Sequence, residues 1–212
     1  DNPGLRFALA STSVEETLGQ YRGSMQMLFE GAILAMIVIW IFLRDWRATI
    51  IGALALPLSI LPTFAMMELA GFTLNTITLL ALTVVVGILV DDAIVEVENI
   101  NRHMKDGRSV EQATEIAVEE IGLAVIATTF ALVAVFLPTA IMTGIPGLVF
   151  KQFGWTAVAA VLFSLVVARL VTPMLASRFL RPLPHTEPAD GPIMTTYLRA
   201  VRWSLAHRRI TL

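Results

Sequence analysis

Long runs without a charged residue constrain this chain more than any other feature. Residues 48–67 are twenty in a row without a charge, and residues 121–150 are thirty. About 20 apolar residues suffice for a helix to cross the roughly 30 Å hydrocarbon core of a bilayer. Charged residues make up only 15% of the chain, against about 25% in soluble domains. We therefore expect an all-α membrane protein, because such segments must satisfy their backbone hydrogen bonds internally.

Charges, glycines and prolines between these runs predict a bundle of five transmembrane helices plus short interfacial helices. The spans are expected at residues 25–43, 48–67, 74–100, 121–141 and 153–177. Asn75 or Thr73 can cap the third span. Pro57 and Pro62 should kink or break the second, and Ser109 should open a short amphipathic helix that ends near Glu120.

The remaining segments are expected outside these five spans. Residues 1–24 are interpreted as the end of a periplasmic segment. Residues 182–192 are rich in proline and predict a linker. Residues 193–212 predict an amphipathic helix on the cytoplasmic face and the start of another membrane helix. Because the chain begins without methionine and stops as an apolar run starts, we expect it to be an excerpt of a longer protein.

The distribution of arginine and lysine predicts the orientation in the membrane. Basic residues are enriched in cytoplasmic loops. If loops 44–47 and 101–120 and the tail after residue 176 are cytoplasmic, that side holds eleven basic residues and the other side holds three. We therefore expect the N-terminus on the periplasmic side and the C-terminal tail in the cytoplasm.

Two adjacent aspartates, Asp91 and Asp92, interrupt the third span directly after the fifteen uncharged residues 76–90. One central aspartate costs roughly 2.5–3.5 kcal/mol in a membrane helix. Two neighbouring carboxylates in a poorly polarisable site cannot both ionise cheaply, so they titrate as a coupled pair. That behaviour suits a pair that loads a proton on one side and releases it on the other. The alternatives are a pair that only fixes helix packing and a site for another cation such as sodium.

Other residues of the spans could support this pair. Gly87, one turn before Asp91, would let another helix approach closely. Arg169 is the basic residue within a predicted span, so either it partners the aspartates or the partner lies outside this chain; it could also extend to the inner interface. Glu30 is expected to be an interfacial or packing carboxylate. Glu96 and Glu98 are expected to be solvated or capping residues.

Several classes of function find no support in the sequence. There is no cysteine, which excludes thiol chemistry and zinc–thiolate sites. The three histidines form no ligand cluster, and no phosphate-binding loop or nucleophile motif appears. We expect no enzyme activity, no metal or cofactor, and no nucleic-acid partner, since no basic stripe is interleaved with aromatic residues.

The segment around the aspartates, GILVDDAIVEVENI at 87–100, resembles the resistance–nodulation–division superfamily. Within it, the similarity is to hydrophobe and amphiphile multidrug efflux pumps of the acriflavine-resistance type. Further stretches agree in order and spacing: EGAILAMIVIWIFLRDWRAT (30–49), LPLSILPTFAMM (56–67), GFTLNTITLLAL (71–82), FLPTAIMTG with the later KQF (136–153) and VTPMLASRFLRP (171–182). The chain resembles transmembrane helices two to six of such a pump and the lead-in to the seventh. Arg169 and Pro62 depart from the pattern of many members.

The resemblance implies a function and a set of partners. It implies a homotrimeric drug/proton antiporter of the bacterial inner membrane, docked to a periplasmic adaptor and an outer-membrane channel. Asp91 and Asp92 match the proton-relay aspartates of such pumps, whose lysine partner comes from the second half of the protein. Alternatives are a heavy-metal or lipid exporter of the same superfamily, and a membrane scaffold that transports nothing.

Overall fold

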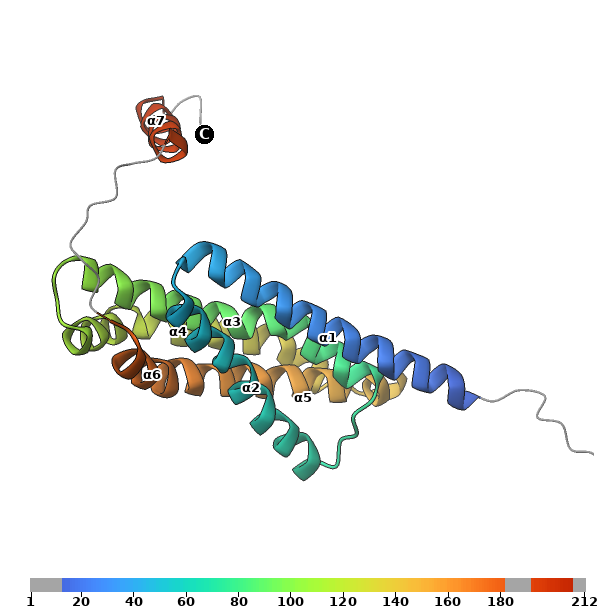
Figure 1. Cartoon of the computed structure of the whole chain (residues 1–212). Helices are drawn as coiled ribbons and strands as arrows, with labels where there is room; N and C mark the ends of the chain where they lie inside the picture. The colour runs from blue at the N-terminus through green and yellow to red at the C-terminus, as the bar shows by residue number, and fades with distance from the viewer. Residues whose placement is uncertain (1–12, 182–191, 208–212) are drawn as a thin grey trace, which may run out of the picture.

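The computed structural model describes residues 13–181 and 192–207, and all regular structure in them is helical (Figure 1). The N-terminal twelve residues, most of the predicted linker and the last five residues lie outside the described part. The elements are α1 (Ser13–Leu43), α2 (Trp46–Leu69), α3 (Thr76–Lys105), α4 (Val110–Ala140), α5 (Gly144–Val166), the π-helical turn η1 (Val167–Val171), α6 (Thr172–Phe179) and α7 (Pro192–Ala206).

Five helical segments are long and apolar enough to cross a membrane: α1, α2, α3, α4, and the continuous segment of α5, η1 and α6. The predicted fold class, an all-α membrane protein, is confirmed. A helix rises 1.5 Å per residue, so the 30 residues of α3 extend for about 45 Å. Helix α3 is therefore longer than the roughly 30 Å thickness of a hydrocarbon core.

Helix α3 lies at the centre of the bundle, in contact with α1, α2, α4 and α5 (Figure 1). Its residues from Leu79 to Val90 supply half of the buried residues of the main core, against which Ile39 of α1, Leu56 of α2 and Val161 of α5 are buried. Because four helices pack around α3, the surroundings of a carboxylate on α3 depend on which of these helices it faces.

Local hydrogen bonds fix where the helices start. Asn75 caps α3 by accepting from the backbone N–H groups of Ile77 and Thr78, while the Thr78 hydroxyl accepts from the Asn75 N–H. Ser109 caps α4 with Gln112 in the same reciprocal way. Both predicted caps are confirmed, with Asn75 as the cap of α3. Each satisfies N–H groups that a helix start would otherwise leave unpaired.

The helix bounds differ from the expected ones in several places. Helix α1 already begins at Ser13, and α5 begins at Gly144 after a short turn. The expected separate helix ending near Glu120 is wrong, because α4 continues from Val110 to Ala140. The helix continues through Gly122, which lies where its polar part meets its apolar part, so the change in polarity does not mark a helix boundary. Helix α2 also continues through Pro57 and Pro62 as one helix.

The wide turn η1 follows from a proline. Pro173 has no N–H, and its ring would clash with the carbonyl of the residue four positions earlier, Arg169. The preceding turn is widened, and the N–H of Thr172 bonds to the carbonyl of Val167 five residues before it. Such single π turns occur often at functional sites.

Candidate functional site

Asp92 lies at the interface of α3 with α5. Its carboxylate is partly buried, and its Oδ2 is 3.1 Å from the hydroxyl of Ser164 on α5. The same hydroxyl lies 3.2 Å from the carbonyl oxygen of Leu89. Ser164 is itself buried, so this side of Asp92 is held in a packed interface. One of the two predicted aspartates is thus oriented by a residue that the sequence analysis did not identify.

Asp91 faces a different part of the bundle. Its side chain is exposed and lines a groove of about 680 Å³ between α1 and α3, together with Leu34, Val38 and Leu132. Gly87 lines the same groove, and a Cβ added there would have no heavy atom within 4 Å. The described residues therefore leave open space beside Gly87 and Asp91. The 100° rotation per helical residue explains why adjacent aspartates face different neighbours.

Arg169 pairs with Glu96. Its Nη1 lies 3.4 Å from Oε2 of Glu96, and its Nη2 donates to the carbonyl oxygen of Val118 at 2.8 Å. No bond from Arg169 to either aspartate occurs among the described residues. The expectation that Glu96 is solvated or a cap is wrong, because its side chain is completely buried. The sequence predicts a solvent-exposed Glu96, because the charged end of α3 begins at this residue.

The guanidinium of Arg169 fits against α4 because Gly122 has no side chain. A Cβ at this position would lie 2.6 Å from Nη2 of Arg169. Arg169 itself is about one-fifth exposed. It therefore lies at the edge of the packed interface, with one side towards a buried acid.

Glu30, another predicted supporting residue, is exposed on α1. Its Oε1 accepts a 2.7 Å hydrogen bond from the Gln26 side chain on the same helix. Its neighbour Gly31 lines the groove, but Glu30 does not. The structure therefore places Glu30 apart from both aspartates.

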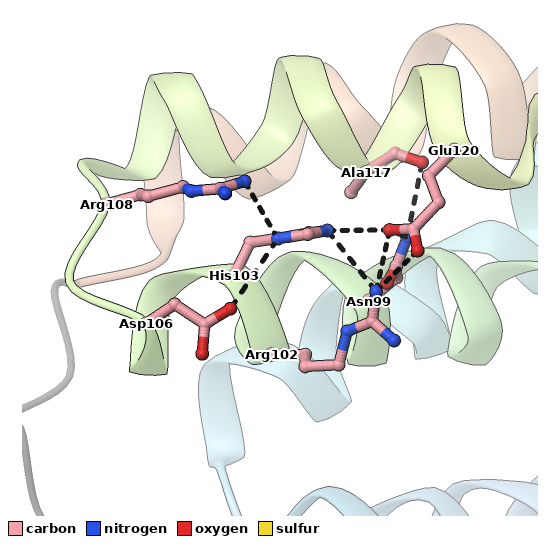
Figure 2. Close-up of polar contacts among 7 residues, drawn as sticks. All are labelled: Asn99, Arg102, His103, Asp106, Arg108, Ala117 and Glu120. Atoms are coloured by element: carbon pink, nitrogen blue, oxygen red, sulfur yellow. Dashed lines mark hydrogen bonds and ion pairs between the residues drawn. The ribbon is translucent and has the colours of Figure 1, made fainter.

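A second polar cluster joins the end of α3 to α4 (Figure 2). The carboxylate of Glu120 accepts hydrogen bonds from Arg102 at 2.7 Å, from His103 Nε2 at 2.7 Å and from Asn99 at 3.3 Å. Nδ1 of His103 lies 3.1 Å from Arg108 Nη1. If Nε2 carries the histidine proton, Nδ1 can accept from Arg108, so a neutral ring satisfies both contacts. The cluster fastens the α3–α4 connection.

Among the residues that the structure describes, no group of three or more histidine and acidic side chains could hold a metal ion. The aspartate pair thus stands with a hydroxyl neighbour on one side and an open groove on the other.

Comparison with known proteins decides the family. The sequence profile of the AcrB/AcrD/AcrF family matches residues 13–212. The chain belongs to the AcrB/AcrD/AcrF family. This confirms the resemblance to acriflavine-resistance-type pumps of the resistance–nodulation–division superfamily. The family match covers every helix described above, including α7.

Several curated relatives of this chain carry the name multidrug resistance protein MdtC. The one from Pectobacterium atrosepticum is 42% identical over 192 residues, which cover 87% of this chain and 19% of the relative. Those from Pectobacterium carotovorum and Yersinia pestis are each 41% identical, over 87% and 83% of this chain. The chain spans about a fifth of the length of the curated relatives it matches.

Proposed function

We propose that this chain is part of an efflux transporter that exports hydrophobic or amphiphilic compounds in exchange for protons. The observation that carries the proposal is the pair Asp91 and Asp92 on the central helix, one against Ser164 and one beside an open groove. The relatives' printed name, multidrug resistance protein, supports the substrate class. Such a protein is a transporter and not an enzyme, with protons as the coupling ion.

The two aspartates divide the task by their surroundings. Asp92 accepts a hydrogen bond from Ser164 on α5, so a change in its protonation state would alter the contact between α3 and α5. Asp91 lines the groove, where a cationic side chain from the rest of the pump would contact it. Uptake of a proton neutralises one carboxylate and weakens its attraction to that cation. A proton that moves down the membrane potential releases about 2.3 kcal/mol of free energy per 100 mV, which can drive export.

The proposal includes the location and the partners of the whole protein. The excess of basic residues at the α1–α2 and α3–α4 connections supports a cytoplasmic position for this end of the bundle. We propose a multi-pass protein of the bacterial inner membrane, assembled with its own second-half helices into a homotrimer. A periplasmic adaptor and an outer-membrane channel would complete the export route.

Drug susceptibility of a pump-deleted host carrying the full-length protein tests this function. We expect Asp91→Asn and Asp92→Asn each to abolish resistance to dyes and detergents at unchanged protein levels. Glu30→Gln is the matched control, because Glu30 is an exposed carboxylate bonded only to Gln26 in the described contacts. Intact resistance in both aspartate variants would indicate a scaffold. Sensitivity to metal salts alone would indicate a metal exporter, and loss of activity on removing sodium would indicate sodium coupling.

A further inference from the structure

The carboxylate of Glu96 is buried in the bundle, but the proposed proton site does not use it. Its side chain is 0% exposed. Oε2 lies 3.4 Å from Arg169, whereas Oε1 is buried and has no hydrogen-bond partner among the described residues. A buried carboxylate oxygen without a partner is costly, and such a group calls for an explanation. It retains a free lone pair that can accept a proton.

Glu96 continues the line of Asp92 along α3. Residues four apart share a helix face and are about 6 Å apart along the axis. Both acids meet the same neighbouring segment, because Asp92 contacts Ser164 of α5 and Glu96 contacts Arg169 of η1. Two carboxylates thus follow each other along one interface, towards the end of the bundle that holds the α3–α4 connection.

The π turn brings the partner of Glu96 onto this interface. The acids are four residues apart on α3, but Ser164 and Arg169 are five apart. In a regular α-helix, five residues overshoot one turn by about 140°. The widened turn η1 takes more residues per turn and returns Arg169 to the side that faces α3.

Among the residues that the structure describes, one cationic side chain lies beside Glu96. Beside the pair, α4 contributes the Val118 carbonyl and Gly122, which do not titrate. From α2, Ala55 packs in an apolar cluster with Ala93 and Val167. Among the described residues, Arg169 is the basic group within ion-pair distance of Glu96.

We propose that Glu96 is a second proton carrier in series with Asp92, and that Arg169 positions it. This inference rests on the proposed function. The proton leaves the carboxyl oxygen of Asp92 and binds Oε1 of Glu96, directly or through one water molecule. One O–H bond breaks and one forms, which restores the Asp92 carboxylate. Arg169 holds Oε2, so Oε1 is the oxygen that receives the proton and later passes it to water at the α3–α4 end.

The full-length protein in proteoliposomes tests this step, with ethidium as the transported dye and pyranine as the internal pH indicator. We expect Glu96→Gln to slow dye-coupled proton flux by about tenfold or more, since a positioned proton carrier contributes at least that. The pH dependence of the flux should also change. Glu98→Gln is the matched control, an exposed carboxylate two residues further along α3. It should leave both the rate and the pH profile unchanged.

A double variant separates a proton carrier from a structural ion pair. Replacing a buried ion pair with apolar side chains of similar size often leaves stability unchanged or raises it. Glu96→Met with Arg169→Met should therefore fold, and its proton flux should stay as low as that of Glu96→Gln. Recovery of wild-type flux and pH profile in the double variant overturns the inference, as does a wild-type rate in Glu96→Gln.

Two further measurements keep the inference separate from the proposed function. If Asp92→Asn leaves coupled flux intact, the proposed function fails and the inference fails with it. If Asp92→Asn abolishes flux while Glu96→Gln does not, only the inference fails. Infrared difference spectra between two pH values, taken on Asp91→Asn with Asp92→Asn, should retain the band of a buried carboxylic acid. Loss of that band also overturns the inference, whatever the folding yield of the Glu96 variants.

Discussion

The hydroxyl of Ser164 on α5 lies 3.1 Å from Oδ2 of Asp92 on α3, although the two residues are 72 positions apart in the chain. This contact joins the central helix to the helix that continues into the π turn. A change in the charge of Asp92 therefore acts directly on α5. In the proposed function, Ser164 is the residue through which protonation of Asp92 would influence the packing of α5 against α3.

Ser164→Ala should weaken both stability and coupled transport. It removes a buried hydroxyl within hydrogen-bond distance of Asp92 and Leu89. We expect a loss of about 1 kcal/mol in the free energy of unfolding, typical for one hydrogen bond. Proton-coupled dye flux in proteoliposomes should fall. Ser177→Ala is the control, because the exposed Ser177 hydroxyl donates locally to the Met174 carbonyl in the described part of the chain. Equal effects of the two changes would contradict the prediction.

Gly154→Ala should destabilise the protein strongly. A Cβ at this position of α5 would lie 2.3 Å from the backbone nitrogen of Ala140 at the end of α4. Since backbone atoms cannot move aside cheaply, we expect a loss of about 3 kcal/mol. The thermal unfolding of the full-length protein in detergent measures it. Gly23→Ala is the matched control, with open space around the added Cβ, and a loss of similar size there would argue against close helix packing as the cause.

Glu120→Ala should loosen the connection between α3 and α4. The carboxylate of Glu120 accepts from three donors, so its removal leaves Arg102, His103 and Asn99 without this partner (Figure 2). We expect the melting temperature to fall by several degrees. The Glu120 side chain is 44% exposed, so added salt should shrink the difference from wild type by screening the Arg102 pair. Glu119→Ala, the exposed neighbour, should have little effect at any salt concentration.

Gly87→Leu should block transport without unfolding the described bundle. Gly87 lines the groove beside Asp91, and nothing lies within 4 Å of an added Cβ. If a helix from the rest of the pump packs there, a leucine side chain would displace it. We expect normal protein levels and unchanged thermal stability of the five-helix region, with coupled flux near background. Wild-type flux in this variant would mean that no partner needs the space beside Gly87.

Local features of the sequence determined the fold class and several details. The uncharged runs predicted a helical membrane protein, and five long apolar helices are present. Asn75 and Ser109 were recognised as caps because capping involves residues only two or three positions apart. The limits of α4 were harder to predict. Its polar first turns and apolar remainder predict two helices. They form one helix, because the polarity of a side chain depends on its surroundings and does not set where the backbone helix ends.

The sequence by itself determined that two aspartates lie in an apolar helix, because composition and spacing are properties of one segment. Only the tertiary structure decided what each acid meets. It placed Ser164 on Asp92, a groove beside Asp91, and Arg169 on the buried Glu96. The physical reason is that these contacts join residues 72 or 73 positions apart. Which side chains meet depends on how the helices pack and on one widened turn before Pro173, and neither is encoded in the periodicity of a single segment.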